Sequence, residues 1–202
     1  MLNILARASV SRLLDPVAAW LLRVGVGPDT VTVVGTVGTV ASALWFFPRG
    51  QLLAGTVAVT LFVLFDLLDG AIARARGYGT PFGTVLDATC DRIADGALFA
   101  GLTWWCFEVG DDRPLAVAAL LCLVSAQVIS YIKARAEATG LSADGGVVER
   151  AERLIITLLG VGLTGVGVPV AIEVALWSLA GLQLVTVIQR MLAVRRSAQR
   201  AR

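Results

Sequence analysis

The chain has 202 residues, of which 57% are hydrophobic and 16% charged, with a formal net charge of +2 and a mean hydropathy of +0.80. Soluble domains average about 45–50% apolar and about 25% charged residues, so this composition excludes an ordinary soluble enzyme, a disordered tail and a disulfide scaffold. The small net charge gives no indication of nucleic-acid binding. Histidine is absent, which excludes histidine metal sites, histidine general bases and Ser-His-Asp triads.

The first 28 residues predict a short helix in the cytoplasmic membrane interface rather than a cleavable signal peptide. Arg7, Arg12 and Asp15 interrupt any apolar core that a signal peptide needs. Asp15-Pro16 is typical of a helix start, and apolar residues then recur at helical spacing.

Five charge-free stretches follow, each near the length of about 20 residues that spans a bilayer. A shorter one at 96–107 becomes long enough only if its helix starts near residues 81–83. The predicted spans are 30–48, 51–75, 82–107, 114–138, 148–168 and 170–196. Most of the 17 Lys and Arg residues fall in connections and termini on one side, so both termini are predicted to be cytoplasmic. The predicted fold class is therefore all-α, a polytopic membrane protein with a single domain over 1–202. It comprises an interfacial segment at 1–28, a six-helix bundle at 29–196 and a basic tail at 197–202.

Five aspartates lie in the second and third spans, where ionisable residues are costly and usually functional. They are Asp66, Asp69, Asp87, Asp91 and Asp95. The first two share a helix face, as do the next two, and a short connection makes the two helices antiparallel neighbours. A hard divalent cation such as Mg²⁺, Mn²⁺ or Ca²⁺ relieves the repulsion among four converging carboxylates, and phosphoryl-transfer sites often hold two such ions.

Two other interpretations of these aspartates remain open. They could be structural partners of Arg74, Arg76 and Arg92, although five carboxylates outnumber three arginines. They could also form the cation or proton pathway of a transporter. Gly70 and Gly83 remove side chains beside the carboxylates, which permits close helix packing, close approach of a bulky substrate, or both. Arg74 can bind a phosphate with its planar fork. This combination favours a site for a polyphosphate ester.

Residues 66–91 resemble the signature of the CDP-alcohol phosphotransferase family, D-x2-D-G-x2-A-R-x8-G-x3-D-x3-D, at every fixed position and every gap. The matching residues are Asp66, Asp69, Gly70, Ala73, Arg74, Gly83, Asp87 and Asp91. The resemblance implies a six-helix, homodimeric enzyme that transfers the phosphatidyl group of a CDP-linked lipid to an alcohol and releases CMP.

The same resemblance implies residue roles. Asp66, Asp69, Asp87 and Asp91 are expected to bind Mg²⁺, or Mn²⁺ in its place, as two ions. Asp91 is also expected to be the general base that takes the proton of the acceptor hydroxyl. The residues expected to contact the CDP-lipid are Asp29, Thr30, Val31, Thr32, Gly70, Arg74 and Thr80. For the segment 29–32, a helix cap without any nucleotide contact is the alternative.

The segments SYIKARAE from Ser130 and ERAERLI from Glu149 resemble the bacterial phosphatidylinositol phosphate synthases of this family, which join CDP-diacylglycerol to inositol phosphate. Carried over by position, the residues that hold the acceptor phosphate are Ser130, Lys133, Arg153 and Arg195, with Arg190 and Arg196 as close alternatives to the last. These basic residues could instead signal topology and contact anionic lipids.

The sequence thus predicts an enzyme of the plasma membrane with its active site toward the cytoplasm. A phosphatidylglycerol phosphate synthase acting on glycerol 3-phosphate is the close alternative. A cation or proton transporter and a structural membrane scaffold are alternatives of other classes. Asp95, outside the signature, is expected to pair with Arg92 or a neighbouring helix, without a catalytic role. Cys90, Cys106 and Cys122 are expected to be buried small apolar residues.

Overall fold

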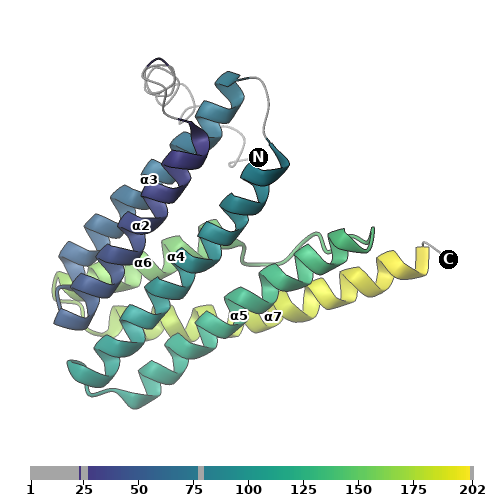
Figure 1. Cartoon of the computed structure of the whole chain (residues 1–202). Helices are drawn as coiled ribbons and strands as arrows, with labels where there is room; N and C mark the ends of the chain where they lie inside the picture. The colour runs from purple at the N-terminus through teal and green to yellow at the C-terminus, as the bar shows by residue number, and fades with distance from the viewer. Residues whose placement is uncertain (1–22, 24–26, 77–79, 201–202) are drawn as a thin grey trace. The chain divides into compact units, whose positions relative to one another are not determined.

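The computed structural model describes residue 23, residues 27–76 and residues 80–200, and within residues 66–76 it describes only the backbone. The elements in chain order are α2 (Pro28–Phe46), the 3-10 helix η1 (Phe47–Arg49), α3 (Leu52–Arg76), α4 (Pro81–Glu108), α5 (Arg113–Ala138), α6 (Arg150–Gly165) and α7 (Val170–Arg200) (Figure 1). Of the described residues, 86% are helical and none lies in a strand. Nearly all of the expected interfacial segment lies outside these ranges.

The six helices expected from hydropathy are present within a few residues of their predicted ends. Among the described residues, three helical stretches are long and apolar enough to cross a membrane, namely Pro28–Arg49, Arg113–Ala138 and Val170–Arg200. Within the part of α3 whose side chains the structure describes, Leu52–Phe65 is a shorter apolar stretch. These helices are consistent with a membrane protein, whereas the full count of six spans and the cytoplasmic termini remain predictions.

Local chemistry explains where the helices begin and end. Asp112 caps α5, since its carboxylate accepts a hydrogen bond from the backbone N–H of Leu115 at 2.9 Å. Glu149 and Glu152 form a reciprocal capping box at the start of α6. Gly50 closes the turn after η1 with φ = +72°, a left-handed conformation that favours glycine.

The chain divides into two compact units, and the first comprises residues 1–42 and 58–94. Within it, Gly38 of α2 lies so close to the ring of Phe62 in α3 that a side chain there would overlap the ring. The buried hydroxyl of Thr36 donates to the carbonyl of Thr32 at 2.8 Å, and that of Thr32 donates to Pro28 at 3.1 Å. Such bonds satisfy polar side chains within their own helix, as a lipid environment requires.

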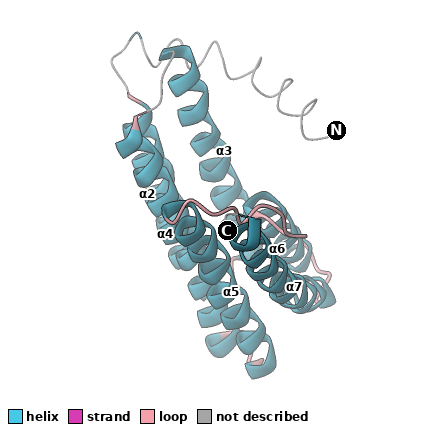
Figure 2. Ribbon diagram, turned by 90° about the vertical axis from the view of Figure 1, so that its right-hand side faces the viewer, coloured by secondary structure: helices cyan, strands magenta, loops and turns pink. Residues whose placement is uncertain are grey.

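The second unit comprises residues 43–57 and 95–202, and here α7 packs against both α5 and α6 (Figures 1 and 2). Gly160 of α6 lies against the side chain of Ala175, so the two helix backbones approach closely. The hydroxyl of Thr164 accepts a hydrogen bond from Ile172 at 3.0 Å and thereby joins the two ends of the turn between α6 and α7. That both units belong to one domain over 1–202 remains a prediction.

The three cysteines are buried and carry no disulfide, which confirms that expectation.

Candidate functional site

The starts of α2 and α4 meet in the first unit, at Gly83 of the signature. Thr80 caps α4, because its hydroxyl accepts a hydrogen bond from the backbone N–H of Gly83 at 2.9 Å. A Cβ at Gly83 would lie 3.0 Å from the Thr80 hydroxyl oxygen and 3.2 Å from Oδ1 of Asp29. Two residues expected to contact the CDP-lipid, which lie far apart in the sequence, therefore crowd the same glycine.

The segment at the start of α2 presents two kinds of side chain. Val31 and Thr32 are buried, at 1% and 4% exposure, and so help to pack the unit. Asp29 is half-buried and Thr30 is exposed. Of these four described residues, Asp29 and Thr30 are thus the ones whose side chains a ligand can reach.

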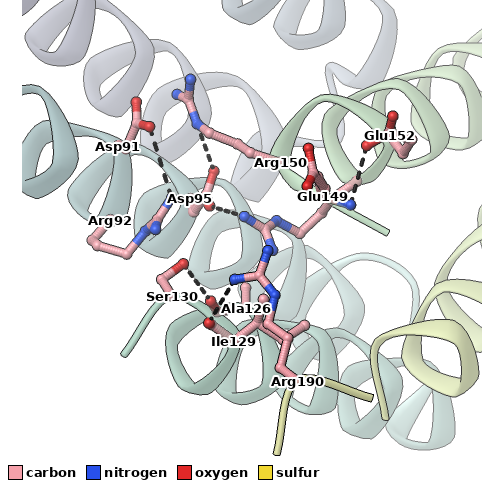
Figure 3. Close-up of polar contacts among 11 residues, drawn as sticks. Asp91, Arg92, Asp95, Ala126, Ile129, Ser130, Glu149, Arg150, Glu152 and Arg190 are labelled. Atoms are coloured by element: carbon pink, nitrogen blue, oxygen red, sulfur yellow. Dashed lines mark hydrogen bonds and ion pairs between the residues drawn. The ribbon is translucent and has the colours of Figure 1, made fainter. Parts of the chain in front are cut away.

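The signature aspartates of α4 lie on one face of this helix, near the end that is predicted to face the cytoplasm. Asp87 is exposed and Asp91 half-buried. Oδ2 of Asp91 lies 3.8 Å from Nη2 of Arg92, a long and partly exposed ion pair (Figure 3). Exposed ion pairs of this kind contribute little to stability, so the pair with Arg92 does not explain why an acidic residue stands here. The structure does not describe the side chains of the signature residues in α3. These residues are Asp66, Asp69, Gly70, Ala73 and Arg74.

The described carboxylates are of the kind that the expected metal prefers, although they form only part of the expected site. Among the described side chains no group of three acidic or cysteine residues is placed to hold a metal ion. Asp87 and Asp91, four residues apart on α4, supply two of the four expected oxygen donors. Accessible carboxylate oxygens at this spacing fit a hard divalent cation.

A second polar cluster lies in the second unit and centres on Asp95, which is fully buried. Its Oδ2 accepts a hydrogen bond from Nη2 of Arg153 at 2.7 Å, and its Oδ1 lies 3.7 Å from Nε of Arg150 (Figure 3). Arg153 is itself almost fully buried, whereas the side chain of Arg150 is 27% exposed. The structure therefore shows Asp95 paired with the neighbouring helix α6, one of the two pairings expected from the sequence.

The other residues expected to bind the acceptor phosphate differ in their surroundings. The Ser130 hydroxyl donates to the carbonyl of Ala126 at 3.0 Å, and Nζ of Lys133 lies 4.0 Å from Glu137. Arg195 is exposed on α7. Their assignment to the acceptor stays a prediction.

Arg190, named above only as an alternative to Arg195, is the buried arginine of α7. Its Nη1 donates to the carbonyl of Ile129 at 3.0 Å (Figure 3), and its Nε donates to the carbonyl of Gly145 at 3.1 Å. These bonds tie α7 to α5 and to the loop before α6. The sequence contained one usable signal, an arginine at helical spacing among apolar residues of α7, but it did not separate Arg190 from its basic neighbours.

The model of the CDP-alcohol phosphatidyltransferase family matches residues 26–191. The chain belongs to this family. Among CDP-alcohol phosphatidyltransferases, the chain is 56% identical over 193 residues to the phosphatidylinositol phosphate synthase of Mycobacterium tuberculosis (strain ATCC 25618 / H37Rv). That match covers 94% of this chain and 89% of the relative. This chain is also 56% identical over 198 residues to the phosphatidylinositol phosphate synthase of Mycobacteroides abscessus, and that match covers 98% of this chain and 90% of the relative.

Solved structures of this family match the fold as well. The crystal structure of the Mycobacterium tuberculosis phosphatidylinositol phosphate synthase with CDP-DAG bound superimposes with a TM-score of 0.88, covering 91% of this chain and 94% of the other. A second structure of that enzyme, in complex with manganese and citrate, also gives a TM-score of 0.88 at 56% identity, covering 91% of this chain and 90% of the other. These similarities identify the chain as an enzyme of phospholipid synthesis.

Proposed function

We propose that this protein transfers the phosphatidyl group of CDP-diacylglycerol to inositol phosphate and releases CMP. The observation that carries the proposal is a complete signature in a chain 56% identical, over 94% of its length, to a phosphatidylinositol phosphate synthase. In this reaction an acceptor hydroxyl oxygen bonds to the lipid-side phosphorus of the pyrophosphate. The bond from that phosphorus to the bridging oxygen breaks, and CMP leaves with that oxygen.

The donor subsite is assigned to the residues that meet around Gly83 together with those of α3. Asp29 and Thr80 crowd the glycine in the first unit, which supports their contact with one ligand. Thr30, Val31 and Thr32 are the other proposed contacts, at the start of α2. Val31 and Thr32 are buried there and anchor the segment that presents Asp29 and Thr30. Gly70 and Arg74 are the proposed contacts from α3, where an arginine fork suits a phosphate.

Asp91 is the proposed general base, which accepts the proton of the attacking hydroxyl. Its half-buried position on α4 keeps the carboxylate reachable. The carboxylates of Asp66, Asp69, Asp87 and Asp91 are the proposed ligands of Mg²⁺ or Mn²⁺, as two ions. The bound cations supply neutralisation of charge on the pyrophosphate, and positioning with charge neutralisation is the main requirement of phosphoryl transfer.

The acceptor subsite is assigned to one serine and three basic residues of the second unit. Ser130 and Lys133 on α5, Arg153 on α6 and Arg195 on α7 are the proposed contacts with the acceptor phosphate. Planar guanidinium groups bind phosphate oxygens in pairs, which favours an acceptor that carries a phosphomonoester.

The proposed setting is the plasma membrane, with six spans in one domain, both termini in the cytoplasm and a homodimer as the assembly. The apolar helices and the basic residues at their ends support this orientation. Membrane lipids are the proposed surroundings of the exposed apolar side chains.

The test is CMP release by purified protein with CDP-diacylglycerol and Mg²⁺, with each acceptor supplied separately. The acceptors are inositol phosphate, glycerol 3-phosphate, inositol and serine. Release with inositol phosphate alone is the expected result. Release with glycerol 3-phosphate alone replaces the acceptor and keeps the reaction. No release with any of the four, from folded protein, contradicts the enzyme and favours a transporter.

A further inference from the structure

The carboxylate of Asp95 contacts two arginines of one helix turn. The family signature ends before Asp95 and gives this residue no role in the reaction. Arg150 and Arg153 stand three residues apart at the start of α6, so both point to the same side of the helix. Asp95 reaches Arg153 through a bond of 2.7 Å and lies 3.7 Å from Arg150. One buried carboxylate thus contacts both cations of the first turn of α6, and Figure 3 draws these contacts around Asp95.

Stability alone is a weak reason for such an arrangement. The desolvation of two buried charges consumes most of the attraction between them, so a buried ion pair is often no more stabilising than apolar residues of the same size. What a buried ion pair does supply is a fixed geometry. An arginine side chain has several rotatable bonds, and a short charge-assisted hydrogen bond holds its fork in one orientation.

A fixed fork matters when a charged ligand is to be bound. A cation that is already oriented loses less conformational entropy on binding, so affinity rises without any new contact. The two arginines differ in exposure, because Arg153 is almost fully buried while the side chain of Arg150 remains partly exposed. The carboxylate that holds the buried arginine is therefore also placed to orient the accessible one.

We propose that Asp95 is a positioning residue for the acceptor subsite, where it holds the buried Arg153 in place and orients the accessible Arg150 toward the phosphate of the acceptor. This inference rests on the proposed function, since it presumes a phosphorylated acceptor. It goes beyond the signature, which ends at Asp91, and it adds Arg150 to the residues that set the preference for a phosphate.

The test compares Asp95→Asn with the wild-type protein in separate titrations of inositol phosphate and CDP-diacylglycerol. The amide keeps the size of the side chain but removes the charge that holds the arginines. The KM for inositol phosphate is expected to rise about tenfold, equivalent to about 1.4 kcal/mol, while the KM for CDP-diacylglycerol stays within about twofold. Inorganic phosphate, used as a competitor of the acceptor, is expected to inhibit the variant more weakly by a similar factor.

Asp95→Glu serves as the second variant, because it keeps a carboxylate in the site if the asparagine variant fails to fold. Moving the carboxylate by one methylene group is expected to raise the acceptor KM less than Asp95→Asn does, again without changing the donor KM. Thr103→Val is the matched control, since Thr103 is a buried polar residue of the same helix whose hydroxyl bonds the carbonyl of Phe99. Its two KM values are expected to equal those of the wild type.

A purely structural role predicts a different pattern. Equal changes of both KM values in the folded Asp95 variants, or no change in either, overturn the inference. A wild-type protein that releases no CMP with inositol phosphate contradicts the proposed function instead, whatever the variants do. The two failures are therefore distinguishable.

Discussion

Gly83→Ala tests whether the meeting of α2 and α4 forms the donor subsite. The added Cβ would lie 3.0 Å from the Thr80 hydroxyl oxygen and 3.2 Å from Oδ1 of Asp29, so both neighbours must shift by a few tenths of an ångström. Alanine in a helix is generally more stable than glycine by about 0.5–1 kcal/mol. Disturbing the cap formed by Thr80 costs about 1 kcal/mol, so the two effects on folding nearly cancel.

The expected result is therefore a variant with nearly unchanged stability and weakened donor binding. We expect the KM for CDP-diacylglycerol to rise about tenfold, or about 1.4 kcal/mol, while the KM for the acceptor stays unchanged. CMP release measures both constants, and thermal unfolding in detergent measures stability.

Gly96→Ala is the matched control for this substitution. Gly96 lies in the same helix, but nothing stands within 4 Å of the position its Cβ would take. Its replacement is expected to leave both KM values unchanged and to raise the unfolding midpoint by about 1–4 °C, because only the gain in helix propensity remains. If Gly83→Ala and Gly96→Ala give the same donor KM, the assignment of Asp29 and Thr80 to the donor subsite is wrong.

Four further outcomes are expected. Asp91→Asn abolishes CMP release while binding of labelled CDP-diacylglycerol persists, and retained turnover removes Asp91 from the role of base. Lys133→Ala raises the acceptor KM more than the donor KM, and equal effects in the same titrations contradict its assignment. EDTA abolishes CMP release, and either Mg²⁺ or Mn²⁺ restores it; activity that survives complete chelation argues against a metal site. Gln183→Leu raises the free energy of unfolding by about 1 kcal/mol, because this fully buried amide has no hydrogen-bond partner among the described residues. Thermal unfolding in detergent checks this, and a loss of stability points to a partner such as a buried water.

The sequence by itself determined the helices and the family. Apolar runs separated by charged connections placed all six helices, because the periodicity and length of an apolar segment are local properties. The signature identified the chemistry, since its carboxylates, glycines and arginine stand at fixed spacings.

Only the tertiary structure decided which residues meet across the helices. It brought Asp29 of α2 beside Gly83 of α4, and it paired Asp95 with Arg153 of α6, a partner on another helix that the sequence did not name. It also separated a buried Arg190 from an exposed Arg195 on α7. These outcomes depend on how each helix is rotated and packed against its neighbours. Rotation is set by side chains far apart in the chain, so no local pattern of residues contains it.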